Sequence, residues 1–128
     1  MGRIVHFEIH AQNPERALEF YENVFDWTAE QWGDMDYWLL VTGEADEPGI
    51  DGAITKREGP RPTGHDPFNG FACTVDVDSV DETVDLVERF GGKVITEKHA
   101  VDGVGWLAYC EDTEGNQFGL MEADETAA

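Results

Sequence analysis

The chain contains the same unit twice, and this repeat restricts the fold more than any single motif. Each unit is a short apolar strand, a tight turn and an amphipathic helix. Aligning Phe7 with Phe71 places Ile9 on Cys73, and the loss of one loop residue then aligns the two helices. The repeat of about 63 residues therefore accounts for most of the chain of 128 residues. Because neither copy could bury its sheet alone, we expect the two copies to combine.

The first copy defines the clearest strand and helix. The strand covers residues 4–9, and alternation along it separates two faces. The apolar face comprises Val5, Phe7 and Ile9, and the polar face comprises His6, Glu8 and His10. Asn13 is the expected N-cap of the helix, with Pro14 at its first position and Asp26 at its end in left-handed geometry.

The rest of the chain supplies further strands and a second helix. Strands are predicted at residues 37–42, 50–56, 71–77, 93–98, 106–111 and 117–122. The second helix begins at Asp78 or Ser79 and ends at Gly91 and Gly92. The sequence thus predicts an α+β fold, in which two βαβββ-type modules in tandem form one curved mixed sheet, a cup, with the helices on its convex side.

The boundaries follow from the same pattern. We expect a single domain over residues 1–123, with module one at about residues 3–56 and module two at about residues 70–122. The proline- and glycine-rich linker covers residues 57–69, and residues 124–128 form a flexible tail. In this arrangement the helices pack against the apolar strand faces, including Val5, Phe71 and Cys73. The polar faces, His6, Glu8 and His10 with Gly70, Ala72 and Thr74, line a central hollow, which is a natural small-molecule site.

The charge of the chain is unusual. There are 28 acidic and 8 basic residues, a formal net charge of −20, and the acidic residues are spread along the whole sequence. Such a surface repels itself at low salt but not at molar salt, where the Debye length is about 3 Å. We therefore expect a halophilic protein, with an ordinary acidic protein as the alternative. Nucleic acid and anionic membranes are excluded as partners, because phosphate contacts require clustered Lys and Arg.

Other classes are disfavoured by what the sequence lacks. There is no apolar run of membrane-spanning length and no secretory leader, so we expect a cytoplasmic protein without a membrane partner. Cys73 and Cys110 do not have metal-type spacing, and we expect a buried, reduced pair. Thr42, Ser79 and Cys110 do not have the signature of an activated nucleophile with a base and an orienting partner.

Three segments together resemble the vicinal oxygen chelate superfamily, which includes glyoxalase I, bleomycin-resistance proteins and extradiol dioxygenases. They are VHFEI with the PERALEFYENVFDW helix, GFACTVDVDSVDETVDLVERFGGKV, and the hairpin EDTEGNQFGLME. The resemblance covers about residues 3–122, and the first strand and helix resemble a glyoxalase-related subgroup. It implies a homodimer and a small-molecule ligand.

The resemblance also implies positions for a divalent metal, carried by the first and last strands of each module. The first-strand position falls on His6, which is a suitable ligand. Its counterpart in module two falls on Gly70 and the last-strand position on Gly119, and neither glycine has a ligating side chain. In residues 50–55, Asp51 has a carboxylate. Because a catalytic metal usually has about three protein ligands, the superfamily's chelate is expected to be broken here and no cofactor is required.

The remaining candidates surround the polar strand face. His6, Glu8 and His10 are interpreted as the polar floor of a ligand pocket, with Glu8 as a buried acid or base. The alternatives are a partial metal site, completed by Asp51 or Gln117, and a purely structural set of hydrogen-bonded side chains. Further pocket residues are Trp38, Thr74, Trp106 and Gln117, although core packing is the alternative for both tryptophans.

Three functional hypotheses follow. The first is a small-molecule-binding protein related to glyoxalase and bleomycin-resistance proteins, without the usual chelate, that sequesters its ligand or performs metal-independent acid–base chemistry. The second is a metal-dependent lyase, isomerase or dioxygenase with a rearranged ligand set around His6. The third is an interaction module without a ligand.

Overall fold

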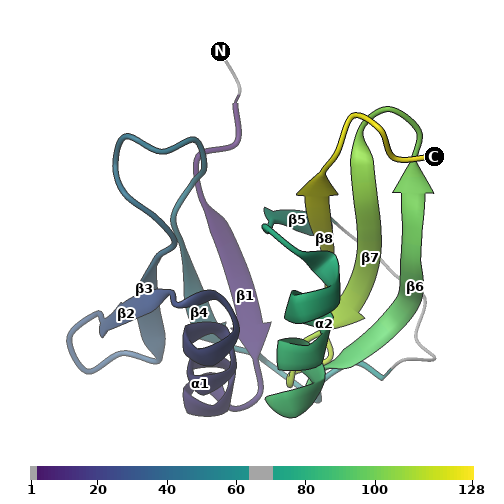
Figure 1. Ribbon diagram of the computed structural model, residues 1–128. Helices are drawn as coiled ribbons and strands as arrows, with labels where there is room; N and C mark the ends of the chain where they lie inside the picture. The colour runs from purple at the N-terminus through teal and green to yellow at the C-terminus, as the bar shows by residue number, and fades with distance from the viewer. Residues whose placement is uncertain (1–2, 64–70) are drawn as a thin grey trace. The chain divides into compact units, whose positions relative to one another are not determined.

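The structure is a computed structural model that describes residues 3–63 and 71–128. Within these residues, the strands form two four-stranded sheets, each accompanied by one helix (Figure 1). The chain divides into two compact units, Met1–Arg61 and Pro62–Ala128, which we call module one and module two. In the described part of the chain, neither helix is long and apolar enough to cross a membrane.

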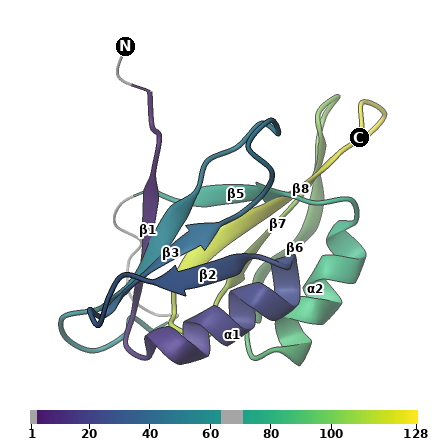
Figure 2. The ribbon, with the colours of Figure 1, turned by 90° about the vertical axis from the view of Figure 1, so that its left-hand side faces the viewer.

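Module one has the order β1-β4-β3-β2 in its sheet. Its elements are β1 (Phe7–Ala11), α1 (Pro14–Phe25), β2 (Thr28–Gln31), β3 (Tyr37–Val41) and β4 (Gly52–Lys56). β1 and β4 are parallel, and the other pairs are antiparallel. α1 contacts β1 and β4 (Figure 2).

Module two repeats this topology, with the order β5-β8-β7-β6. Its elements are β5 (Cys73–Asp76), α2 (Val80–Arg89), β6 (Lys93–Val101), β7 (Gly105–Glu111) and β8 (Gln117–Ala123). β5 and β8 are parallel, and the other pairs are antiparallel. The predicted α+β fold and its two βαβββ modules are confirmed, with one sheet in each module.

The helix ends follow the local sequence as predicted. Asn13 Oδ1 accepts a hydrogen bond from the backbone N–H of Arg16 (3.1 Å), and Pro14 is the first residue of α1. Asp26 closes the helix in the left-handed region, with φ 60°. At α2, Ser79 Oγ accepts from the backbone N–H of Glu82 (3.1 Å), which identifies Ser79 rather than Asp78 as the cap.

Aromatic side chains fix the end of α1 against the sheet. The Trp27 ring stacks on Tyr21, with centroids 5.0 Å apart and an interplanar angle of 5°. Phe25 and Phe7 contact the same indole, at 5.2 and 5.9 Å. This cluster joins the helix to β1 and explains the tryptophan two residues after Phe25.

Gly52 allows the close approach of β1 and β4. It pairs with Phe7, and a Cβ atom at position 52 would lie 2.5 Å from the Phe7 carbonyl oxygen and 2.7 Å from its ring. The Phe7 ring therefore fills the space that a side chain on β4 would occupy. The glycine in this strand thus marks a close contact between strands.

The apolar strand faces start later than predicted. β1 begins at Phe7 and β5 at Cys73, so the preceding residues lie outside the strands that the helices cover. Val5 is 76% exposed and Phe71 is 93% exposed, and Cys73 is also exposed. The expectation that these three side chains pack under the helices is wrong, and Cys110 alone of the two cysteines is buried.

The tail was expected to be flexible, but its described residues fold back onto module two. The Trp106 indole N–H donates to Asp124 Oδ2 (3.1 Å), and Ala127 is only 3% exposed. The backbone N–H of Gly103 donates to the Ala127 carbonyl (3.0 Å). These contacts attach the C-terminal segment to the turn between β6 and β7.

The outer strands of the two sheets differ in character. β2 is a short polar strand, TAEQ, which the sequence pattern did not predict. β6 is 9 residues long and extends past the predicted end to Val101. Its pairing with β7 shifts register twice, between Val94 and Thr96 and between Thr96 and His99.

Candidate functional site

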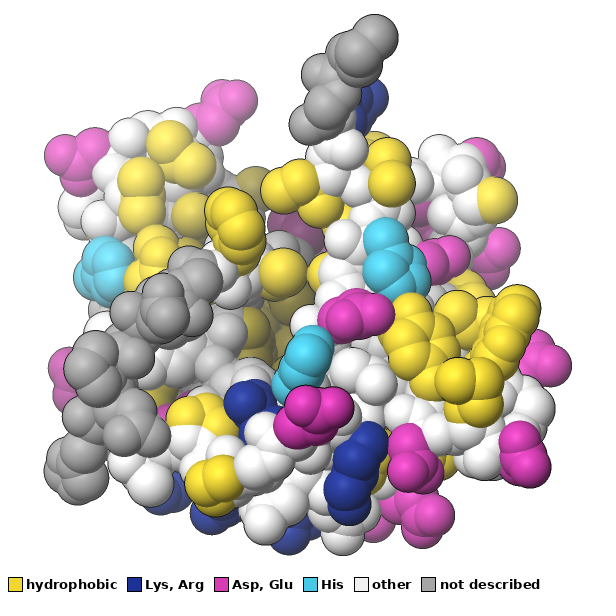
Figure 3. All heavy atoms as spheres, turned by 180° about the vertical axis from the view of Figure 1, so that it is seen from behind, with side chains coloured by type: hydrophobic (Ala, Val, Ile, Leu, Met, Phe, Trp, Pro, Cys, Tyr) yellow, Lys and Arg dark blue, Asp and Glu magenta, His cyan; other side chains and the backbone are white. Residues whose placement is uncertain are grey.

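The polar row of β1 lies on the sheet face opposite α1. Phe7 and Ile9 are partly buried and Ala11 is buried, whereas His6, Glu8 and His10 are exposed. The row therefore does not lie under the helix, which is what the sequence predicted. In Figure 3, histidine side chains lie beside acidic side chains at the surface.

Tyr37 completes this row from β3. It pairs with Thr55 of β4, which in turn pairs with His10, so the tyrosine shares the face of the row. The Tyr37 phenol oxygen lies 3.1 Å from His6 Nε2 and also hydrogen-bonds to the Glu8 carboxylate. His10 Nε2 lies 3.5 Å from Glu8 Oε1. We call His6, Glu8, His10 and Tyr37 the polar face of module one.

Tyr37 is a member of the polar face that the sequence pattern does not predict. The segment YWLLV is apolar throughout, so its alternation does not reveal which side chains face the helix. The pairing of Tyr37 with Thr55 supplies that information, and it places Tyr37 and not Trp38 beside Glu8.

The surroundings of Tyr37 favour the neutral form of its phenol. Burial, followed by the charge of Glu8 and the hydrogen bond to it, raises the pKa of Tyr37 above the usual 10.0. A neutral phenol can donate to the Glu8 carboxylate and accept from His6 at the same time. The result is a continuous polar chain from His6 through Tyr37 and Glu8 to His10.

The acid–base hypothesis assumed a buried Glu8, and this assumption is wrong. The Glu8 side chain is 44% exposed and that of His10 is 51% exposed. An exposed carboxylate with a tyrosine and a histidine on either side can still accept a hydrogen bond or a proton from a bound molecule. The exposed part of this carboxylate is accessible to a ligand.

Trp38 does not share the polar face. It pairs with Ile54 and precedes Leu40 by two residues, and both of these side chains are in the buried core. Trp38, which is partly buried, therefore lies on the same side of the sheet as these core residues. Trp38 is thus not part of the polar face, and its assignment to a pocket stays a prediction.

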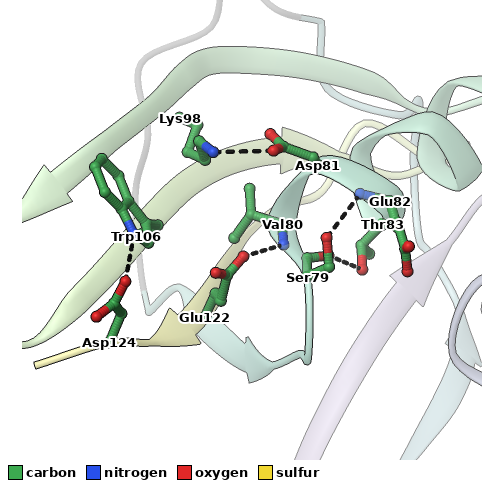
Figure 4. Close-up of polar contacts among 9 residues, drawn as sticks. All are labelled: Ser79, Val80, Asp81, Glu82, Thr83, Lys98, Trp106, Glu122 and Asp124. Carbon is green, nitrogen blue, oxygen red and sulfur yellow. Dashed lines mark hydrogen bonds and ion pairs between the residues drawn. The ribbon is translucent and has the colours of Figure 1, made fainter. Parts of the chain in front are cut away.

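Trp106 also lies on the helix side of its sheet. Besides its bond to Asp124, its ring lies under Lys98, with Nζ 5.1 Å from the centroid. Lys98 Nζ in turn binds Asp81 Oδ2 of α2 at 3.0 Å (Figure 4). Hydrogen bonds from Thr126 are the main reason that the pKa of Asp124 is lowered, and the bond from Trp106 adds to them. Trp106 thus joins β7 to the tail and, through Lys98, to α2, and its assignment to a pocket stays a prediction.

Thr74 and Gln117 lie on the other face of module two. Thr74 pairs with Gly119, which pairs with Tyr109, so these residues share a face. Gln117 lies two residues before Gly119 on β8 and therefore points to the same side. We call Thr74, Tyr109, Gly119 and Gln117 the Tyr109 face.

At the superfamily's metal positions other than His6, the described residues do not fit a metal. A Cβ atom on Gly119 would lie 3.0 Å from Thr74 Oγ1 and 3.3 Å from Tyr109 Cε1, so neighbouring side chains fill the place of a ligand. The Asp51 Oδ1 atom accepts from the Thr42 backbone N–H at 2.8 Å, which attaches this carboxylate to the neighbouring turn. Gly70 lies outside the described residues. Across residues 3–63 and 71–128, no three His, Cys, Asp or Glu side chains are arranged to hold a metal ion.

The chain belongs to the Glyoxalase/Bleomycin resistance protein/Dioxygenase superfamily, which it matches over residues 3–120. Proteins of this superfamily bind small molecules. No curated protein matches the sequence closely.

Solved structures with the same fold have low sequence identity to this chain. A hypothetical protein, SA1046 from S. aureus, is 19% identical with a TM-score of 0.69, covering 96% of this chain and 99% of its own. A point mutant of the fosfomycin resistance protein FosX from Listeria monocytogenes, complexed with Mn(II) and 1S,2S-dihydroxypropylphosphonic acid, is 17% identical with a TM-score of 0.72, covering 97% and 92%. A superfamily enzyme from Burkholderia phytofirmans is 16% identical with a TM-score of 0.70, covering 93% and 97%. At these identities the likeness establishes the fold alone.

Proposed function

We propose that this protein binds a small polar molecule at the polar face of module one, without the divalent metal chelate of its superfamily. The observation that carries the proposal is the polar chain in which Tyr37 links His6 to Glu8. Its side chains come from β1 and the residue just before it, and from β3, which is not a neighbour of β1 in the sheet. They are already held together before a ligand arrives. A binding site organised in this way loses less conformational freedom on binding.

The chemistry of the polar face suits direct hydrogen bonding. Glu8 supplies an acceptor, the histidines supply donors or acceptors according to their tautomers, and Tyr37 fixes the position of the carboxylate. These groups can also exchange a proton with a bound molecule, so metal-independent acid–base chemistry is within their reach.

The occupied space at Gly119 supports the absence of the chelate. The Mn(II) in the FosX complex keeps the metal-dependent alternative a concrete one to test, with His6 as its surviving ligand position. Metal content after purification without added ions decides between the two hypotheses. Substoichiometric metal supports the proposal, whereas a stoichiometric divalent ion that is lost with His6→Ala overturns it.

Ligand binding is tested by thermal unfolding in concentrated salt with EDTA and a panel of polar metabolites. We expect at least one compound to raise the melting temperature of the wild type. Tyr37→Phe and Glu8→Gln should each reduce this stabilisation, because each removes a hydrogen-bonding partner.

Matched controls distinguish the loss of ligand binding at the polar face from the general effect of removing a charge or a phenol oxygen. Glu30→Gln removes the same charge from β2, in the same row of side chains but three strands from β1, about 14 Å away. Tyr21→Phe removes a phenol oxygen from the buried cluster around Trp27. A panel in which no compound stabilises the protein, or in which the controls lose as much as the site variants, would refute ligand binding at the polar face.

A further inference from the structure

The loop between β6 and β7 contains an aspartate followed by a glycine, Asp102 and Gly103. Val101 pairs with Gly105 across the hairpin, and the turn is closed by a hydrogen bond from the Val104 N–H to the Val101 carbonyl oxygen (2.9 Å). This bond does not involve the Gly103 N–H. Asp102 and Gly103 are both exposed, and Gly103 has φ 73°, a left-handed conformation that glycine adopts without strain. The loop therefore presents a carboxylate next to a peptide nitrogen that no side chain shields.

An aspartate that precedes a glycine can isomerise without an enzyme. The Gly103 nitrogen attacks the carboxyl carbon of Asp102, a carbon–nitrogen bond forms, and the carboxyl hydroxyl leaves with the nitrogen's proton as water. Water then adds to one of the two carbonyl groups of the five-membered ring. One opening restores aspartate, and the other gives isoaspartate, in which the backbone runs through the former side chain. The attack requires the nitrogen to release its proton and its peptide group to turn toward the carboxyl carbon.

The C-terminal segment, residues 124–127, holds the nitrogen that would attack. The Gly103 N–H donates to the Ala127 carbonyl oxygen at 3.0 Å. The Asp124 N–H donates to the Val104 carbonyl oxygen, also at 3.0 Å. The loop is thus bound to the segment at two successive residues, and the Gly103 proton is held by the segment rather than by the hairpin.

Asp124 fixes the shape of this segment. Its Oδ1 atom accepts from the Thr126 backbone N–H (2.9 Å) and hydroxyl (2.6 Å), and its Oδ2 atom accepts from the Trp106 indole (3.1 Å; Figure 4). The Ala127 N–H donates to the Asp124 carbonyl oxygen at 3.1 Å, and Ala127 is 3% exposed. These contacts fold the segment into a compact turn that brings the Ala127 carbonyl oxygen to Gly103.

A second aspartate–glycine pair, Asp51 and Gly52, is held in a different way. Gly52 pairs with Phe7 on one side and with Leu40 on the other, within the sheet of module one. The Asp51 carboxylate accepts from the Thr42 backbone N–H at 2.8 Å. The sheet fixes this pair, so it serves as an internal reference for the pair in the loop.

We propose that residues 124–127 protect the Asp102–Gly103 peptide from isomerisation, by holding the Gly103 nitrogen against the Ala127 carbonyl. Detachment of the segment makes this loop a site of spontaneous isoaspartate formation. Isoaspartate adds one carbon to the backbone of the loop and so disturbs the connection between β6 and β7. Neither the polar face nor a ligand takes part, so this role is independent of the proposed function.

The test measures isomerisation of the full chain, incubated folded at weakly acidic pH in concentrated salt. Digestion with endoproteinase Asp-N reports it, because this enzyme cleaves before aspartate but not before isoaspartate. A synthetic peptide of residues 99–107 gives the rate of the unprotected sequence, and the wild type should be slower. Asp124→Ala removes the hydrogen bonds to this carboxylate and should raise the rate at Asp102 about two- to tenfold, the effect of one lost hydrogen bond at Gly103. Hydrogen exchange at the Gly103 amide should accelerate in the same variant.

Two further variants identify the cause. Glu125→Gln changes the charge of an exposed side chain that makes no hydrogen bond in the described part of the chain, and the rate should not change. Thr126→Val loses one hydrogen bond to Asp124, should raise the rate by less than Asp124→Ala, and decides the test if Asp124→Ala does not fold. A wild type as fast as the peptide, variants of Asp124 and Thr126 no faster than the wild type, or an equal effect of Glu125→Gln would each overturn the inference. Equal acceleration at Asp51 would overturn it too, because the whole chain and not the loop would then have loosened.

Discussion

Replacing Gly52 by alanine tests the account of how β1 is held against β4. The new Cβ atom would lie 2.5 Å from the Phe7 carbonyl oxygen, where carbon–oxygen contacts between strands are about 3.3 Å or longer. One obstacle is therefore backbone, which cannot rotate away, and the strands must separate by about 1 Å. The second obstacle is the Phe7 ring, at 2.7 Å, which would have to leave its contact with Trp27.

Overpacking of this kind costs about 1–3 kcal/mol, and the backbone obstacle puts Gly52→Ala at the upper end, about 3 kcal/mol. This is a large part of the roughly 5–15 kcal/mol that typically separates folded from unfolded protein. The free energy of unfolding is measured by denaturant titration, with the slope compared to confirm that the same surface is exposed.

Gly43→Ala is the matched control. Its Cβ would lie 3.4 Å from Glu47 Oε1, an ordinary contact with a flexible side chain, so the stability should change by less than about 0.5 kcal/mol. The double variant Phe7→Ala with Gly52→Ala should lose less than the sum of the single variants, because the ring obstacle is then absent. If Gly52→Ala is as stable as Gly43→Ala, the close approach of β1 and β4 does not require a glycine at position 52.

Three further predictions concern titration, reactivity and salt. Tyr37 should ionise above pH 10 in the folded protein, and Glu8→Gln should bring its pKa down, as followed by phenolate absorbance; an unchanged transition would contradict the polar chain. Because the unfolded chain loses this proton first, the associated stabilisation is complete below pH 10 and is lost as the pH rises through the folded pKa. A thiol reagent should modify Cys73 but not Cys110, whose burial raises its pKa to about 11, and a peptide map with both modified would refute this. Stability, followed by circular dichroism, should increase as added salt shortens the Debye length from about 30 Å to about 3 Å. Full stability in dilute buffer would contradict the halophilic interpretation.

Local signals predicted the backbone well. Asn13, Pro14 and Asp26 define the ends of α1 by their own chemistry, and Ser79 does so for α2. The internal repeat predicted two modules because it depends on many positions at once. β2 escaped detection because an outer strand that buries little needs no hydrophobic alternation.

Side-chain orientation was harder to predict than strand position. Tyr37 and Trp38 are neighbours in an apolar run, and one step of register exchanges them between the core and the polar face. Trp106 was equally ambiguous, because its partner Asp124 lies in a segment expected to be flexible. By contrast, His6, Glu8 and His10 alternate with apolar residues, so their side of the sheet followed from the sequence.

The irregular pairing of β6 affects how this side of its sheet is protected from other chains. A long strand at the margin of a sheet can form hydrogen bonds with a strand of another chain, and proteins usually prevent this pairing with charged side chains. Lys93 and Lys98 stand on β6, but dissolved ions would mask them, as they would mask the surrounding carboxylates. Two register shifts bend the strand regardless of ionic strength. Geometry rather than charge would then protect this margin against fibril growth in concentrated salt.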